Sequence, residues 1–107
     1  MRTLVLSAVL ASPLIILSAY AAEEAVVRQK DKLFSREDLN LKQGDAIQFV
    51  NDDTVTHSIS LKAPDGTSQS GTVQKPGESN RLTFDKSGDW RVLCLIHPKM
   101  KMSVHVQ

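Results

Sequence analysis

The stretch DWRVLCLIHPKMKMSVHV, residues 89–106, contains two segments of alternating apolar and polar residues that are separated by a short loop. In the first segment Trp90, Val92 and Cys94 fall on one side of an extended chain, because successive side chains of a β-strand point to opposite faces. The second segment, KMSVHV, alternates in the same way. The stretch therefore predicts two core strands joined by a loop, and an all-β fold.

Turn signals recur at short intervals along the rest of the chain and divide it into similar segments. Gly44-Asp45, Pro64-Asp65-Gly66 and Pro76-Gly77 are such signals. The expected strands are residues 25–34 at a sheet edge, the two arms of residues 39–51, and residues 57–61, 80–84, 89–94 and 101–106. Residues 35–40 read as a polar loop with room for one helical turn. About seven short strands predict a two-sheet antiparallel β-sandwich with Greek-key connections.

Residues 1–21 are expected to be a secretory signal peptide, and residues 22–107 the single folded domain. Arg2 precedes the apolar run LVLSAVLASPLIIL, and AYA at positions 19–21 supplies the small residues that signal peptidase requires. The run is about 14 residues long, short of the roughly 20 that cross a bilayer as a helix. Cleavage predicts a periplasmic protein, and an uncleaved anchor is the alternative.

Composition narrows the choice of function. Removing Arg2 from the 13 basic residues leaves 12, which balance the 12 acidic ones, so the mature chain offers no basic field for nucleic acid. A domain of about 86 residues has a small core, and small exported domains commonly gain stability from disulfides or a bound metal. Cys94 is the only cysteine, so the chain cannot form an internal disulfide and a metal is favoured.

The loop after Cys94 contains further metal-binding side chains. His97 follows at i+3, near enough through a tight turn to bind the same ion. For a third ligand, His57 begins a strand after a turn-rich segment, whereas His105 alternates with inward-facing valines and should point outward. A thiolate, two imidazoles and a nearby methionine sulfur are the donor set of a blue-copper electron-transfer site, and thioether binds zinc poorly.

Two separated motifs resemble one family. GDWRVLCLIHPKMKMSVHV, residues 88–106, resembles the C-terminal copper loop of the cupredoxins, the type 1 blue copper proteins. Its short Cys-x-x-His-Pro-x-Met form is most similar to that of the amicyanins, and plastocyanin and pseudoazurin are also similar. LKQGDAIQFVNDDTVTHSI, residues 41–59, resembles the segment that leads to the family's first copper histidine. The resemblance covers about residues 39–106 and implies a cupredoxin-like Greek-key β-sandwich that binds one type 1 copper ion.

The resemblance also implies a ligand set. His57, Cys94 and His97 are the expected equatorial ligands, and Met100 is the expected axial ligand. Met102 is the alternative, because it would complete the longer loop found in plastocyanin-like members. It continues the alternation of the closing strand, however, and should pack inward, which leaves Met100 in the loop.

This chain departs from the family pattern at the positions after two ligands. Amicyanins and plastocyanin-like proteins usually have Asn after the first histidine and Ser or Thr after the cysteine, and the two side chains hydrogen-bond. Here the residues are Ser58 and Leu95, which cannot form that bond. Ile96 also replaces a common proline. Because outer hydrogen bonds orient ligands, we expect a looser site or a shifted potential.

The resulting hypothesis is a small periplasmic electron carrier that cycles between Cu(I) and Cu(II) and is not an enzyme. A periplasmic copper carrier that hands its metal to another protein is the alternative, and a metal-free binding module is the third possibility. A thiol enzyme using Cys94 is disfavoured, because no oxyanion site or cleft accompanies the cysteine and histidine.

The same hypothesis assigns a docking surface. Redox protein partners are expected to dock transiently over His97, with Pro98 and Lys99 at its border, and the protein is expected to be a monomer. Lys99 and Lys101 are interpreted as solvated loop charges rather than as a docking patch. Trp90 alternates with Val92 and is interpreted as a core residue rather than an electron relay.

Overall fold

The computed structural model describes residue 3, residues 24–69 and residues 71–107, so nearly all of the predicted signal peptide lies outside the described residues. The strands are β1 (Glu24–Lys30), β2 (Leu33–Phe34), β3 (Asp38–Leu41), β4 (Ala46–Asn51), β5 (His57–Lys62), β6 (Ser68–Gln69), β7 (Val73–Gln74), β8 (Ser79–Thr83), β9 (Gly88–Cys94) and β10 (Lys101–Val106). This part of the chain contains no helix, and hence none that could cross a membrane. Apart from the two-residue strands β2, β6 and β7, the strands agree with the predicted number.

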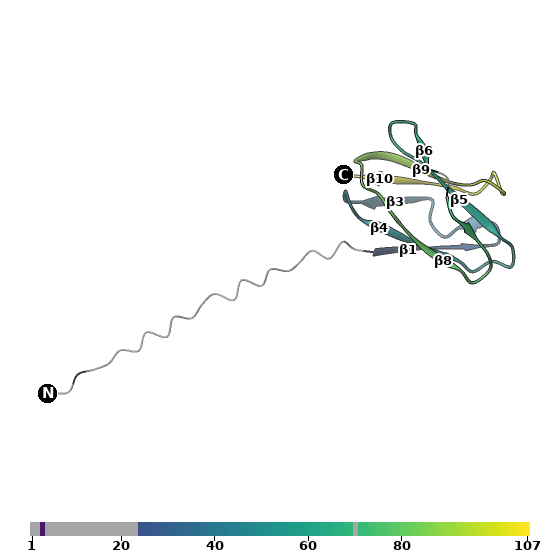
Figure 1. Cartoon of the computed structure of the whole chain (residues 1–107), viewed down its shortest axis with the longest axis horizontal. Helices are drawn as coiled ribbons and strands as arrows, with labels where there is room; N and C mark the ends of the chain where they lie inside the picture. Colours follow the sequence, from purple (N-terminus) through teal and green to yellow (C-terminus); the bar gives the residue numbers. More distant parts are fainter. Residues whose placement is uncertain (1–2, 4–23, 70) are drawn as a thin grey trace.

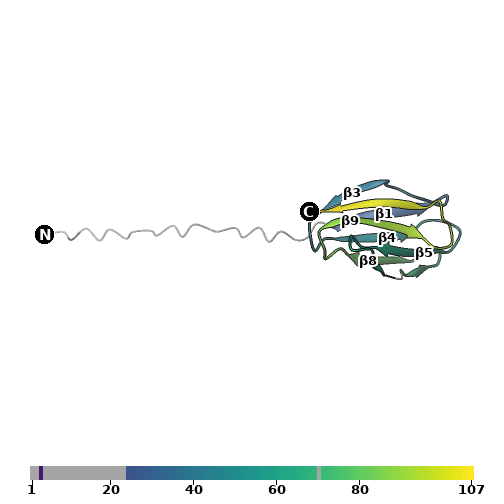
Figure 2. The ribbon, with the colours of Figure 1, turned by 90° about the horizontal axis from the view of Figure 1, so that it is seen from above.

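The strands form two sheets that pack face to face, as the sequence predicts (Figures 1 and 2). One sheet has the order β2-β1-β4-β8, and the other has the order β3-β10-β9-β5-β6, with β7 also paired to β5. The expectation of a purely antiparallel sandwich is wrong, because β1 runs parallel to β4 and β3 runs parallel to β10. Chain crossings between the two sheets place these sequence-distant strands side by side.

The predicted edge strand over residues 25–34 is instead a hairpin of β1 and β2. Asp31 and Lys32 form its turn with φ angles of 52° and 58°. Two successive positive φ values match the right-handed twist of hairpin strands, although Asn and Gly are the residues that usually adopt them. The turn is missed from sequence because Asp-Lys is not a strong signal for it.

The polar loop predicted over residues 35–40 is also partly wrong. Residues 38–41 form β3, which pairs with β10, and the described part of the chain has no helical turn there. Leu39 and Leu41 are buried, as their alternation with polar residues requires. Ile47 and Phe49, on the other side of the Gly44-Asp45 turn, are buried as well. The turn leads from one sheet to the other, because β3 pairs with β10 whereas β4 pairs with β1 and β8.

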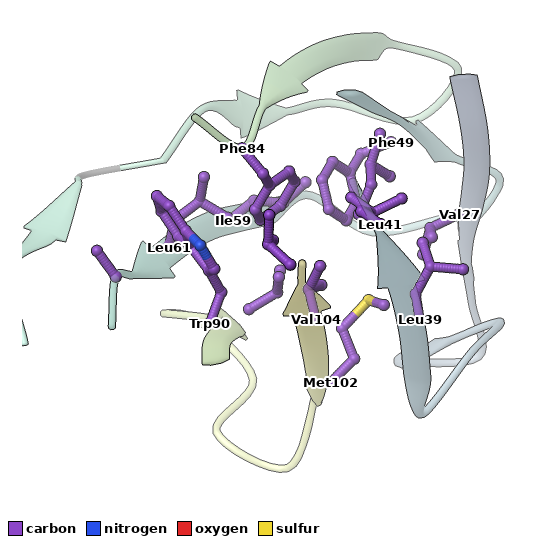
Figure 3. Packing of buried hydrophobic residues seen from close by; sticks show 14 residues of the cluster. Val27, Leu39, Leu41, Phe49, Ile59, Leu61, Phe84, Trp90, Met102 and Val104 are labelled. Atoms are coloured by element: carbon purple, nitrogen blue, oxygen red, sulfur yellow. The ribbon is translucent and has the colours of Figure 1, made fainter. Parts of the chain in front are cut away.

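The core lies between the two sheets (Figure 3). Trp90 is fully buried against Phe84, with ring centroids 5.1 Å apart in an edge-to-face arrangement. The indole Nε1–H of Trp90 donates a 2.9 Å hydrogen bond to the carbonyl of Lys86, so its polar atom is satisfied inside the core. These contacts confirm Trp90 as a core residue.

Candidate metal centre

Strand pairing brings the predicted site residues to one end of the sandwich. β5 begins at His57, β9 ends at Cys94, and the Cα atoms of Ile59 and Cys94 lie opposite each other in this antiparallel pair. The loop of residues 95–100 then returns the chain into β10 and carries His97 beside the same strand ends. Side chains that are 37 positions apart in sequence thus become neighbours.

His57, Cys94 and His97 form a compact cluster of potential ligand atoms. The Sγ atom of Cys94 lies 3.7 Å from Nδ1 of His57 and 3.7 Å from Nδ1 of His97, and the two Nδ1 atoms are 3.2 Å apart. A point equidistant from the corners of this triangle is about 2 Å from each atom, close to the bond lengths that transition metals form with nitrogen and sulfur. The donor triangle therefore fits one such ion.

The three side chains differ in exposure. His57 is fully buried and Cys94 is 2% exposed, whereas the ring of His97 is partly exposed. The expectation that His97 is nearest to solvent in this cluster is confirmed. His97 is therefore the member of the cluster that solvent reaches.

Met100 and Met102 occupy different surroundings. Both are buried, and Met102 belongs to the main cluster of packed hydrophobic side chains (Figure 3), as predicted from its alternation with Val104. Met100 is not a member of that cluster. The backbone of Met100 is bonded to the cluster on both sides. Its carbonyl accepts a 3.1 Å bond from the amide of Cys94, and its amide donates a 2.9 Å bond to the carbonyl of His97.

The two segments that carry the cluster are joined through the backbone. The amide of Leu95 donates a 2.9 Å hydrogen bond to the carbonyl of Ser58. The amide of Ser58 in turn approaches the Sγ atom of Cys94 at 3.5 Å. The side-chain bond usual in the family is absent, but these main-chain contacts connect the same two positions.

Asp53 is a neighbour of the cluster that the sequence reading missed. Its Oδ2 atom lies 3.0 Å from Nε2 of His57, the ring nitrogen that faces away from Cys94. Hydrogen bonds from the amides of Lys32 and Thr54, with the nearby His57 ring, hold the pKa of Asp53 low, at about 2. The only sequence signal is an aspartate four residues before the histidine in a turn.

Buried amide side chains hold the loop that leads to His57. Asn51 is fully buried, and its Nδ2 donates 2.9 Å bonds to the carbonyls of Val55 and Gln74. Its Oδ1 accepts a 2.9 Å bond from the amide of Asp53. Since buried polar groups need partners, this network fixes the loop conformation and with it the position of Asp53.

His105 lies apart from the cluster, as predicted, with its ring on the outer face of β10. Its Nδ1 lies 2.7 Å from Oδ1 of Asp89 and its Nε2 lies 3.3 Å from Oδ1 of Asp38. Hydrogen bonds to Asp89 and then to Asp38 raise the pKa of His105 above its ordinary value. The histidine bridges β3 and β9 from the strand between them.

Comparison with known proteins identifies the family. Residues 21–107 match the family described as copper binding proteins of the plastocyanin/azurin family. The chain belongs to this cupredoxin family. The predicted cofactor, one copper ion of type 1, is therefore confirmed at the level of the family, and the thiol and two imidazoles gathered here are donors that suit it.

Two curated relatives of this cupredoxin are methylamine utilization proteins MauL. The protein from Methylorubrum extorquens is 35% identical over 68 residues, which cover 64% of this chain and 60% of the relative. The protein from Methylophilus methylotrophus is 32% identical over 78 residues, which cover 71% of this chain and 45% of the relative. This cupredoxin thus spans about half of the length of these relatives.

Solved structures confirm the fold. Amicyanin from Paracoccus versutus superposes with a TM-score of 0.72 and 22% identity, over 80% of this chain and 83% of that structure. The reduced Cu(I) form of an amicyanin mutant at pH 4 gives a TM-score of 0.71 and 24% identity, over 78% of this chain and 82% of that structure. The cupredoxin-like Greek-key sandwich predicted from the sequence is therefore correct.

Proposed function

We propose that this cupredoxin is an electron carrier in which His57, Cys94 and His97 hold one copper ion and Met100 is a weak axial ligand. The observation that supports it most is the donor triangle, which is buried at two corners and partly exposed at the third. When bound, copper supplies a centre that exchanges one electron between Cu(I) and Cu(II). A copper carrier would instead favour donors that another protein can reach.

The role of the protein chain in this function is to keep the donors in place. Cys94 would hold the copper as a thiolate, with its thiol proton released to solvent on binding. The Met100 carbonyl accepts a hydrogen bond from the Cys94 amide, and the Met100 amide donates one to the His97 carbonyl. These two bonds restrict the loop and would limit movement of the donor atoms between the two oxidation states. A small rearrangement favours fast electron transfer.

The surface around His97 is suited to transient contact with a redox protein. Leu95 and Ile96 are 63% and 52% exposed beside it, and Pro98 is exposed as well. Val73, 59% exposed, lies opposite Ser58 in the neighbouring strand and extends this apolar surface. A small interface of the weak redox type, below about 1,200 Å², would cover it.

Positive charges lie beside this apolar surface. A groove next to the loop has four basic and two acidic side chains in its lining, Arg36, Arg91, Lys99 and Lys101 with Glu37 and Asp38. None of the four basic side chains has an ion pair within residues 24–69 and 71–107. These charges would attract a partner with acidic groups at its docking site. Lys99 and Lys101 are exposed, as expected of solvated charges. With Arg36 and Arg91 beside them in the groove, we propose that they also belong to a docking surface, the role that the sequence interpretation disfavoured.

The proposed location is the periplasm. Residues 1–21 would direct export and be removed, and residues 22–107 would function as a monomeric domain. The name of both curated relatives refers to methylamine utilization, so an amine-oxidising system is the first place to seek the electron donor.

Spectroscopy of the mature domain with added Cu(II) tests the function. An electron carrier of this class should give an intense band near 600 nm from thiolate to copper, a narrow copper hyperfine splitting, and reversible one-electron cycling. The variant Cys94→Ser should lose the band. Colourless bound copper without reversible cycling would favour the copper carrier, and failure to bind copper would exclude both.

A further inference from the structure

We infer that Asp53 is a positioning residue for His57, and that the turn between β1 and β2 holds Asp53 in place for this task. The inference concerns a carboxylate and a hairpin turn outside the proposed ligand set. It rests on the proposed function only where it predicts a reduction potential. The contact itself is a property of the metal-free chain.

Asp53 accepts hydrogen bonds from two directions with the same oxygen. Oδ2 lies 3.0 Å from Nε2 of His57 and 2.8 Å from the amide nitrogen of Lys32, while Oδ1 accepts a 2.8 Å bond from the amide of Thr54. The side chain of Asp53 is 8% exposed and that of His57 is fully buried. Little water therefore competes for these bonds, and the carboxylate is fixed relative to the ring.

This arrangement selects one tautomer of His57. An ionised carboxylate only accepts hydrogen bonds, so Nε2 has to carry the proton that lies between His57 and Asp53. The neutral ring then has its lone pair on Nδ1, which is the atom 3.7 Å from Sγ of Cys94. Asp53 thus leaves Nδ1 of His57, one corner of the donor triangle, unprotonated and able to bind a metal in the metal-free protein.

The turn that reaches Asp53 is strained. Asp31 and Lys32 both have positive φ angles, which non-glycine residues adopt at a cost. In this conformation the amide of Lys32 points to Asp53, 21 residues further along the chain. The contact needs the Lys32 amide and not its side chain, so a substitution that keeps the N–H should preserve it.

A carboxylate on the outer nitrogen has a chemical consequence for the bound state. It raises the basicity of the imidazole and makes His57 a stronger donor, which favours the more highly charged oxidation state of a metal. Removing the negative charge should therefore raise the reduction potential. Asp53→Asn removes the negative charge but keeps an oxygen that can accept the hydrogen bond from Nε2 of His57. Asp53→Ala removes both the charge and the acceptor oxygen.

The first experiment follows the His57 ring nitrogens by ¹⁵N NMR in the metal-free mature domain, at a pH where the ring is neutral. The wild type should show protonated Nε2 and unprotonated Nδ1. Asp53→Ala should shift His57 toward a mixture of tautomers and remove the exchange protection of the Lys32 amide. Asp52→Asn is the matched control, because Asp52 is paired with Arg28 on the surface and should change neither signal.

The second experiment measures the reduction potential of the copper-loaded proteins. Asp53→Asn should raise it and Asp52→Asn should leave it unchanged, while Lys32→Gly should keep both the wild-type potential and the His57 tautomer. If Asp53→Ala does not fold, Asp53→Asn supplies the reduction potential, and the protonation of Nδ1 or Nε2 in the wild type decides the tautomer. Protonated Nδ1 in the wild type, or unchanged His57 signals in a folded Asp53→Ala protein, would overturn the inference even if the protein does carry electrons. If the wild type forms no blue copper site, the proposed function is wrong. The His57 tautomer in the metal-free protein then still decides whether Asp53 positions the ring.

Discussion

Met100 and Met102 are both buried and stand two positions apart, yet only Met102 belongs to the main cluster of packed hydrophobic side chains between the sheets. Met102 begins the inward alternation of β10, where it lies near Val104 and Leu39 (Figure 3). Met100 precedes the strand, and its backbone is bonded to Cys94 and His97. The two sulfur atoms thus have separate roles available to them, one in packing and one at the proposed copper site.

Replacing each methionine by leucine separates these roles. Met100→Leu should shift the visible spectrum and raise the reduction potential, because a weak sulfur donor to the oxidised metal is lost while the apolar volume is nearly kept. Met102→Leu should leave both close to wild type. Spectra and cyclic voltammetry of the two copper-loaded variants measure the difference, and the reverse pattern would assign the axial position to Met102.

Truncation of Met102 should instead affect stability. Met102→Ala should lower the free energy of unfolding by about 2–5 kcal/mol, the range found when a buried methionine leaves a cavity. The effect should appear in the metal-free protein, since it comes from the core. Urea unfolding measures it, with Leu95→Ala as an exposed control expected to change stability by less than about 0.5 kcal/mol. A cost for Met102→Ala as small as that of the control would contradict its place in the core.

The sequence alone predicted the strands that bury one face against the core, because alternation of apolar and polar residues marks them. Only one register of an alternating strand buries both Trp90 and Val92. The predicted bounds of β9 and β10 therefore agree with the structure to within one residue. Asp31-Lys32 lacks the usual residues of a hairpin turn, so the β1–β2 hairpin was not predicted. Asp53 was missed because the contact that fixes it comes from a distant backbone amide, and backbone contacts leave no residue-specific pattern.

The family departure at Ser58 and Leu95 shows a similar limit. Sequence correctly excluded a bond between their side chains, and we expected a looser site. The 2.9 Å bond from the Leu95 amide to the Ser58 carbonyl joins the two segments instead, and any residue except proline could supply this donor. The exposed Leu95 side chain is then available for the docking surface.

Charge reversal in the basic groove should slow reactions with anionic redox partners. The change Arg91→Glu/Lys101→Glu should lower the rate at which ferricyanide oxidises the reduced protein several-fold at low ionic strength, and by much less at high salt, because screening removes the attraction. Stopped-flow kinetics over a salt series measure the effect. The control is Lys42→Glu with Lys86→Glu, which makes the same change in net charge at residues that do not line the groove. Equal slowing in the control would show that total charge, and not the groove, controls the rate.

The bridge made by His105 should make stability depend on pH. Hydrogen bonds to Asp89 and Asp38 raise the pKa of His105 in the folded protein above its ordinary value of 6.5. A histidine whose pKa is raised by folding stabilises the fold at pH values below the unfolded pKa, and this contribution is lost as the pH rises through the folded pKa. The difference in melting temperature between wild type and His105→Gln should therefore be larger at pH 6 than at pH 9.

Thermal unfolding of the copper-loaded proteins at several pH values measures this difference, since both proteins then share the same proposed copper site. Asp89→Asn removes the stronger partner of His105 and should lose most of the same pH dependence, because the folded pKa then returns toward 6.5. Below about pH 4 the aspartates themselves become protonated, so the comparison belongs above that range. A difference that stays constant from pH 6 to pH 9 would mean that His105 contributes through packing on β10 and not through its charge.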